Sequence, residues 1–248
     1  MITLERCNRL LDDGFSLLTV ADNKQPNVKW KELQAKAATK EQFRVMYNMP
    51  STKGVGIITG YGDLECVDVD LKVFSTAPER KDFWEEFLSI LDDNILDFDK
   101  KFTIYRTKNE GFHILYKTKR ASGNTKIAKL KGHTEAVIET RGVGGYVFTY
   151  DGQNIYHNTY SSIQYISDAD RDTLWATALL YNHYDGEPEK PPKRTQTEFA
   201  TGSTPWDDYN SKESVLDVVK NELYIVRQTH DKYVVKRHGA KSPHSGYV

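Results

Sequence analysis

The chain alternates between two spacings of apolar residues, which together predict an α+β fold. In four segments apolar residues recur every three or four positions, as they do in amphipathic helices. The longest segment places Phe83, Phe87 and Leu91 in one row, which we interpret as facing the core. The predicted helices are residues 3–12, which Gly14 ends, a segment opened by the capping-box pattern at 39–42, residues 78–96 and residues 167–184.

Shorter runs rich in β-branched and aromatic residues predict strands between these helices. They are residues 15–20, the two runs that flank the turn at 60–63, and residues 102–106, 111–117, 136–140 and 146–150. We expect 102–106 and 111–117 to form a hairpin. We expect 136–140 and 146–150 to form a second strand pair around the glycine-rich turn at 141–145.

The run after the first turn ends on two aspartates, Asp68 and Asp70. Side chains of a strand alternate between its faces, so these two carboxylates share one face while Val67 and Val69 share the other. Two carboxylates ~5 Å apart would repel by roughly 3 kcal/mol at an effective dielectric of ~20. A divalent cation such as Mg²⁺ or Mn²⁺ would remove that repulsion. The alternative is that the strand ends at Val67 and both aspartates are solvated.

Two further features on predicted strands carry candidate chemistry. A turn at 107–112 delivers His113 onto a strand, and Glu139 and Arg141 precede the glycine-rich turn. With the two aspartates, Glu139 could hold two metal ions ~4 Å apart, as in phosphoryl-transfer sites. His113 and Arg141 could bind triphosphate oxygens. The alternatives are a packed histidine, a solvated glutamate and a plain tight turn.

Composition limits the possible classes of protein. A chain of 248 residues can bury one full core with room for a small second unit, and its net charge of −1 means that any site for a polyanion must be local. The two cysteines, Cys7 and Cys66, can form neither a disulfide framework nor a cysteine-rich zinc site, which fits a reducing cytoplasm. No apolar run approaches the ~18 residues of a membrane span, so we expect no membrane association.

One local basic segment stands out, at 117–131, where six Lys or Arg residues occur without an acidic residue. Such a segment is often plain solvated surface, but beside a metal site it could bind nucleic acid through phosphates. The candidate nucleic-acid-binding residues are Lys117, Lys119, Arg120, Lys126, Lys129 and Lys131.

The composition divides the chain into three parts: a globular domain at 1–185, which carries the candidate chemistry, a flexible linker at 186–205 and a small module at 206–248. The module should contain a helix at 213–221 and strands at 223–226 and 233–236. Alone it is too small to be stable, and the chain could be a fragment of a longer protein.

These motifs, in this order, resemble the bifunctional DNA primase/polymerase (prim-pol) domain of plasmids, phages and other mobile elements, in the archaeo-eukaryotic primase superfamily. The resemblance covers residues 10–185. Its motifs are Lys24-x-Pro26 followed by Trp30, Gly56 to Gly60, Val67 to Asp70, Thr107 to His113, and Ile138 to Tyr146.

The resemblance implies an α+β prim-pol palm, an RRM-like mixed sheet with helices, followed by a small C-terminal α+β module. It implies a two-ion Mg²⁺ or Mn²⁺ site without zinc, and as partners single-stranded DNA template, nucleoside triphosphates and a fused or associated helicase. The implied catalytic and metal-binding residues are Asp68, Asp70 and Glu139, and the implied nucleotide-binding residues are His113, Arg141, Thr107 and Lys108.

The chain departs from the family pattern at two places. Asn109 and Glu110 stand where small residues are usual, and residues 148–152 replace a Pro-Pro-Ser segment, which puts nucleotide contacts from that loop in doubt. The preferred function is primer synthesis or extension by template-dependent nucleotidyl transfer. The alternatives are a glycosyltransferase acting on sugar nucleotides, which also uses Asp-x-Asp with Mn²⁺, and a non-catalytic template-binding replication initiator.

Overall fold

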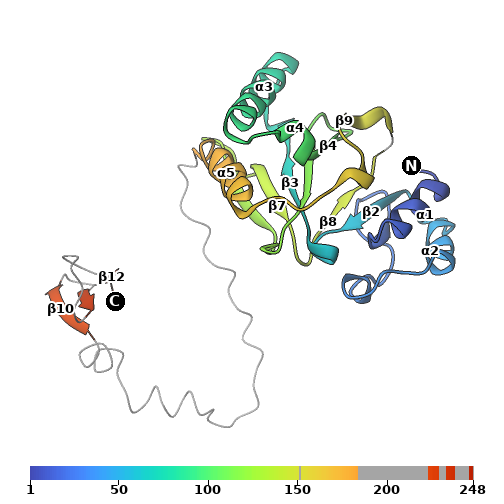
Figure 1. The fold of residues 1–248 in the computed structure, drawn as a ribbon, viewed down its shortest axis with the longest axis horizontal. Coiled ribbons are helices and arrows are strands. Elements are labelled where there is room, and N and C mark those ends of the chain that lie inside the picture. The colour runs from blue at the N-terminus through green and yellow to red at the C-terminus, as the bar shows by residue number, and fades with distance from the viewer. Residues whose placement is uncertain (151, 184–222, 229–232, 238–245, 248) are drawn as a thin grey trace, which may run out of the picture. The chain divides into compact units, whose positions relative to one another are not determined.

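The computed structural model describes residues 1–150, 152–183, 223–228, 233–237 and 246–247 (Figure 1). The chain divides into two compact units, Met1–Glu187 and Pro188–Val248. The predicted linker at 186–205 and the predicted helix at 213–221 lie outside the described residues.

A six-stranded sheet forms the centre of the first unit, with the strand order β6-β7-β3-β5-β4-β9. Every pairing between its named strands is antiparallel, whereas the resemblance implied a mixed sheet. The α+β class is confirmed, and so is the predicted hairpin, which is β4 and β5. The strands are β3 (Leu64–Val69), β4 (Thr103–Arg106), β5 (Phe112–Lys117), β6 (Thr125–Lys129), β7 (Ala136–Arg141) and β9 (Ile155–His157).

Helices α3 (Ala77–Asn94) and α5 (Asp168–Leu179) cover one face of this sheet (Figure 1). Thr76 caps α3 through a capping box with Glu79, which satisfies backbone N–H groups that the first turn leaves unpaired. The predicted row of Phe83, Phe87 and Leu91 is buried against the sheet, so its assignment to the core is confirmed. Helix α5 begins at its Ser167 cap as expected, but it ends at Leu179 rather than near residue 184. The short helix α4 (Phe98–Lys101) follows α3.

The other face of the large sheet packs against a second core, formed with a three-stranded sheet of order β1-β2-β8. Two capped helices belong to this core, and their predicted starts at Thr3 and Thr39 are confirmed. The elements are α1 (Leu4–Asp12), β1 (Leu17–Val20), α2 (Lys40–Tyr47), β2 (Gly54–Ile58) and β8 (Tyr146–Phe148).

The predicted pairing of 136–140 with 146–150 is wrong. Strand β7 pairs with β3 and β6, whereas β8 pairs with β2 in the smaller sheet. The turn between β7 and β8 therefore crosses from one sheet to the other. The connection between β2 and β3 crosses at the same place, where the Thr59 hydroxyl donates a hydrogen bond of 2.7 Å to the Gly142 carbonyl. The β2–β3 and β7–β8 connections therefore run side by side from one sheet to the other, joined by this hydrogen bond. Strand β8 pairs with β2 and not with β7, although the local pattern predicted a hairpin.

Part of the basic segment is a strand that the sequence pattern did not reveal. Strand β6 pairs with β7 at the edge of the large sheet, and Ile127 and Ala128 are buried on it. Because Lys126 and Lys129 flank these two apolar residues, the sequence lacks the longer apolar run or alternation that predicts a strand.

In the second unit the two predicted strands are confirmed as β10 (Leu223–Gln228) and β11 (Tyr233–Arg237), which pair antiparallel. Strand β12 (Gly246–Tyr247) pairs with β11.

Both cysteines, Cys7 and Cys66, are free and buried. Among the helices that the structure describes, none combines the length and the apolar character that a membrane span requires.

Candidate active site

A cleft of about 640 Å³ in the first unit is lined by residues from both of its sheets. The large sheet contributes residues from β3, β5 and β7, and the smaller sheet contributes residues from β2 and β8. All seven residues predicted to bind metal or nucleotide line this cleft: Thr107, Lys108, His113, Asp68, Asp70, Glu139 and Arg141. The fold thus brings together three segments that are distant in the sequence.

Asp68 stands at the centre of the group because β3 is the strand between β5 and β7. In the register of the sheet, Asp68 lies opposite His113 on β5 and opposite Glu139 on β7. The alternation along β3 is the one predicted, since Val67 and Val69 belong to the core beneath α3 and α5. The strand continues to Val69, which removes the alternative of a strand ending at Val67.

The carboxyl group of Asp68 is largely withdrawn from solvent, with 21% of its side chain exposed. Burial raises its pKa to about 6, an effect that the Arg141 charge opposes and the Asp70 charge reinforces. Its nearest cationic group is the Arg141 guanidinium, whose Nε lies 3.9 Å from Oδ2. A buried carboxylate at this distance from its counterion is only partly compensated.

Arg141 lies between two carboxylates. Its guanidinium forms an ion pair with Glu139 and also approaches Asp68, at 3.9 Å. The pKa of Glu139 is raised chiefly by burial, with Arg141 acting against the shift and Asp68 adding to it. The single positive charge of Arg141 is therefore shared by the carboxylates of Glu139 and Asp68.

Asp70 lies just beyond the end of β3 and caps a 3₁₀ turn, Leu71–Val73. Its Oδ1 accepts a hydrogen bond from the Lys72 amide at 3.1 Å, and the Lys72 ammonium lies 3.1 Å from its Oδ2. The same ammonium lies 2.8 Å from Glu135. The backbone amide and the ammonium of Lys72 therefore hold the Asp70 carboxylate in place.

Within the part of the chain that the structure describes, no three His, Cys, Asp or Glu side chains are placed close enough together to hold a metal ion. The donor set nevertheless suits Mg²⁺ or Mn²⁺, because it consists of carboxylates. Asp68 and Glu139 are direct neighbours across the sheet, whereas Asp70 lies just beyond the end of β3 and pairs with Lys72. The metal-binding role of the three acids stays a prediction.

His113 is 5% exposed, and its Nε2 lies 3.6 Å from Oδ1 of Asp68. Burial and, as a smaller cause, the nearby Arg141 charge lower its pKa to about 3. The imidazole is therefore neutral, and its contact with Asp68 is not an ion pair. Its ring packs beside Tyr150, with 5.4 Å between ring centroids. Tyr150 also lines the cleft, and its position at the end of a predicted strand gave no sign of this.

The turn that carries Thr107 and Lys108 is closed by two hydrogen bonds between Thr107 and Gly111, at 2.8 and 3.0 Å. A β-carbon on Gly111 would lie 2.3 Å from the Val69 carbonyl, so only glycine lets the turn approach β3 this closely. Glu110, one of the departures from the family pattern, forms ion pairs with Arg80 and Arg106.

None of the six candidate residues of the basic segment lines the cleft. Lys119 is paired with Asp63, and Arg120 donates two hydrogen bonds to Asp172, at 2.9 and 3.0 Å. Lys117 lies over the Phe15 ring, and Lys129 is buried. Lys126 lies opposite Glu139 in the register of β6 and β7, and Lys131 follows β6.

The lysines that line the cleft come instead from other segments: Lys24, Lys53, Lys72 and Lys108. Of these, the sequence motifs drew attention to Lys24, through Lys24-x-Pro26, and to Lys108. No pattern pointed to Lys53 or Lys72.

Comparison with known proteins identifies one family. Residues 8–171 match the family described as bifunctional DNA primase/polymerase, N-terminal. No curated protein matches the chain.

Proposed function

The chain belongs to the bifunctional DNA primase/polymerase N-terminal family, and from this premise we propose that it catalyses template-dependent nucleotidyl transfer, making or extending primers on single-stranded DNA. The observation that carries the proposal is the row formed by His113, Asp68 and Glu139 across three strands, inside a cleft that Arg141 also lines. This row supports the assignment because its groups come from separate segments and meet at one place.

Asp68, Asp70 and Glu139 would hold the divalent cations. When bound, such ions neutralise the charge that develops as an oxygen attacks the α-phosphorus and pyrophosphate leaves. The raised pKa values of Asp68 and Glu139 fit this role, because a buried, undercompensated carboxylate gains most from a cation.

The cations around these acids would bind the triphosphate. Arg141 can present its planar guanidinium to two phosphate oxygens, and Lys108 lies in the same cleft as a single charge. His113 is neutral, so it would donate one hydrogen bond rather than a charge. Thr107 stabilises the turn that positions Lys108, through its bonds to Gly111.

We further propose that the protein acts in the replication of a mobile element, together with a fused or associated helicase. Family membership disfavours the glycosyltransferase alternative. The three intact acids disfavour a non-catalytic template-binding module.

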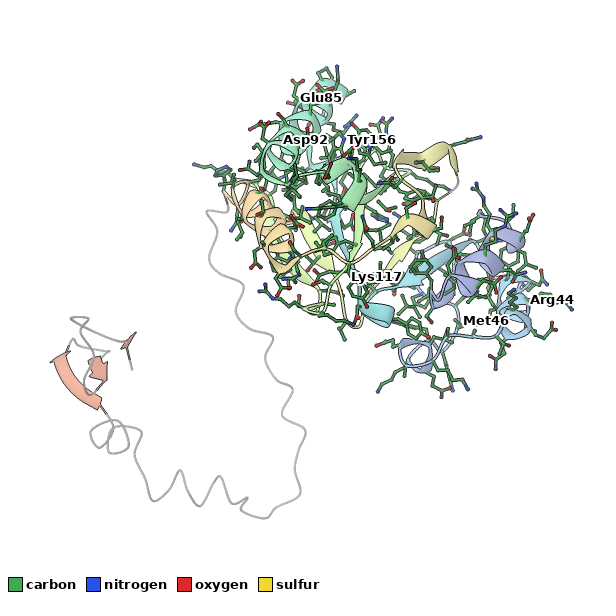
Figure 2. All side chains as sticks on the ribbon, in the orientation of Figure 1. Arg44, Met46, Glu85, Asp92, Lys117 and Tyr156 are labelled. Carbon is green, nitrogen blue, oxygen red and sulfur yellow. The ribbon has the colours of Figure 1, made fainter. Side chains whose placement is uncertain are left out.

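The test is incorporation of labelled nucleotides by the purified protein with Mg²⁺ or Mn²⁺, on single-stranded DNA with and without a primer. We expect product from the wild type and none from Asp68→Ala or Asp70→Ala. Asp92→Ala is the control, because Asp92 lies exposed on α3 (Figure 2). Near wild-type activity of either active-site variant at saturating metal would refute the metal assignment, and absence of product from the wild type would refute the function.

A further inference from the structure

Three half-buried aromatic side chains, Trp30, Tyr146 and Phe148, form what we call the aromatic wall, on the face of the smaller sheet that is turned away from the second core. Trp30 meets Tyr146 edge to face, with 5.5 Å between ring centroids and 76° between the planes. Tyr146 and Phe148 also line the catalytic cleft, so the wall is continuous with it. The wall thus consists of partly exposed rings that lie next to one another on this face of the β1-β2-β8 sheet.

A tight turn at residues 21–24 holds Lys24 next to this wall. Lys24 has a left-handed backbone, with φ of 64°, and its carbonyl accepts a hydrogen bond of 2.8 Å from the Tyr146 hydroxyl. Its ammonium lies over the Phe148 ring, 6.0 Å from the centroid. The Lys24 charge is also among those that lower the pKa of Asp68. The turn therefore places one cation between the aromatic wall and the acids of the cleft.

The wall is flanked by further lysines without acidic partners. Within the described part of the chain, Lys24, Lys29, Lys31 and Lys53 form no ion pair, and all four are exposed. Residues 21–37 together with Lys53 contain five lysines and two acids. In the basic segment, by contrast, Lys119 is neutralised by an acid. Uncompensated positive charge therefore gathers beside the wall.

We propose that the aromatic wall and its lysines bind the single-stranded DNA template and lead it into the cleft, an inference that rests on the proposed function. Aromatic rings on which bases stack, beside cations that meet the phosphates, are the two components of sequence-tolerant single-strand binding. The partly exposed rings favour a single strand over a duplex, because the bases of a duplex are already stacked on each other. The basic segment at 117–131 lacks exposed rings of this kind apart from the Tyr165 contact of Lys119.

The experiment measures binding of a fluorescent thymidine oligonucleotide by anisotropy, with EDTA and without nucleotide, so that catalysis is not required. Trp30→Leu should weaken binding about five- to 150-fold, the range expected for loss of one stacked base. Trp30→Phe should retain most of the affinity. The double variant Lys29→Gln/Lys31→Gln should reduce the slope of log K against log salt by about 1.4, since each lost phosphate contact on a single strand contributes about 0.7.

Two matched controls lie on β9 and α3, outside the aromatic wall and the lining of the cleft. Tyr156→Leu removes an aromatic side chain that is 43% exposed and contacts the Trp84 ring from β9 (Figure 2). Lys81→Gln removes an exposed charge from α3. Both should bind the oligonucleotide like the wild type. Thermal melting of every variant checks folding, and the lysine variant, which alters only exposed side chains, tests the proposal even if Trp30→Leu is unstable.

The outcomes separate this inference from the proposed function. If both Trp30→Leu and the lysine variant bind the oligonucleotide with wild-type affinity, the aromatic wall does not bind the template, even if the protein incorporates nucleotides. Equal weakening for a DNA duplex, or for the two controls, would also overturn this inference. Selective weakening for the single strand, in a protein that incorporates no nucleotide, would support the wall and refute the polymerase function.

Discussion

At the residue scale, the electrostatics of the cleft centre on Asp68. Its carboxyl group lies between His113 and Glu139 in the sheet, and the Arg141 guanidinium beside it is shared with Glu139. Between its unfolded pKa of 3.8 and its folded pKa of about 6, the folded state binds more protons than the unfolded state. The free energy of unfolding contributed by Asp68 therefore falls as the pH rises through this window.

We expect Asp68→Asn to stabilise the metal-free protein at pH 7.5, by up to about 3 kcal/mol, because it removes a buried charge that costs this much at ~1.4 kcal/mol per pKa unit. The gain should shrink as the pH falls from 6 towards 3.8 and vanish below 3.8, as Asp68 becomes protonated in the unfolded state as well. Urea unfolding in EDTA at a series of pH values measures the difference. Parallel pH profiles for the two proteins would contradict the burial of an ionised Asp68.

His113→Ala and Arg141→Ala should chiefly weaken nucleotide binding. Loss of a hydrogen bond to a charged group costs roughly 1.5–3 kcal/mol, or about ten- to more than a hundredfold in affinity. Titration with nucleotide and, separately, with template DNA measures both affinities. Lost template affinity with unchanged nucleotide affinity would overturn the assignment of these two residues.

At the scale of elements, the turn after β7 positions Arg141 by packing against the loop before β6. The Val143 amide donates a hydrogen bond of 2.6 Å to the Ser122 carbonyl. A β-carbon on Gly142 would lie 1.8 Å from that carbonyl oxygen, whereas a β-carbon on Gly144 would meet nothing within 4 Å. The two glycines are therefore required for different reasons, a close approach at Gly142 and a left-handed φ of 81° at Gly144.

These two glycines form a matched pair for substitution. Gly144→Ala should cost about 1–2 kcal/mol of stability through its left-handed backbone and leave nucleotide affinity nearly intact. Gly142→Ala should cost more than this and weaken nucleotide binding as well, because Arg141 must move with the turn. Denaturant unfolding and nucleotide titration of both variants test the difference. Equal behaviour of the two would show that the Ser122 contact does not position Arg141.

A buried ion pair connects β3 to α5. Arg171 donates hydrogen bonds of 2.7 and 2.9 Å to Glu65, which is fully buried, and the Tyr116 hydroxyl donates a third of 2.6 Å. Arg171→Met should destabilise the protein by about 3–5 kcal/mol, because it leaves a buried carboxylate without its cation. The double variant Glu65→Leu/Arg171→Met should regain most of that stability in urea unfolding. A double variant as unstable as Arg171→Met would contradict the role of charge.

At the scale of the whole molecule, the first unit, Met1–Glu187, contains the cleft, the aromatic wall and both crossings between the sheets. The second unit, Pro188–Val248, contributes a separate three-stranded sheet. Its basic residues Lys236 and Arg237 lie on β11, and the predicted linker lies outside the described residues.

We expect a chain that ends near residue 186 to extend a primer but to start new strands poorly. Initiation from two free nucleotides needs more binding energy than extension, because no duplex supplies stacking and phosphate contacts, and the basic residues of the second unit could supply it. The measurement is the initiation-to-extension ratio of both chains at one salt concentration, and equal ratios would refute a role of the second unit in priming.

The sequence by itself determined the elements whose cause is local. The caps at Thr39 and Ser167 satisfy unpaired amides within four residues, and the apolar row on α3 repeats with the helical period. The alternation along β3 placed Asp68 on the face opposite to Val67 and Val69 before any partner strand was known. The motif residues of the cleft were also identified from the chain alone, since each occurs in a short and ordered pattern.

Only the tertiary structure decided how these elements combine. Pairing between strands depends on contacts across the chain, so the partners of β7 and β8 and the edge strand β6 could not be read from local patterns. The same holds for charge: the acidic partners of Lys119 and Arg120 lie at least 52 residues away in the sequence, and none of the six candidate residues of the basic segment lines the cleft. Lys53 reaches the cleft through long-range packing, whereas Lys72 lies there because it follows Asp70 by two residues, and its long-range ion pair is the one with Glu135.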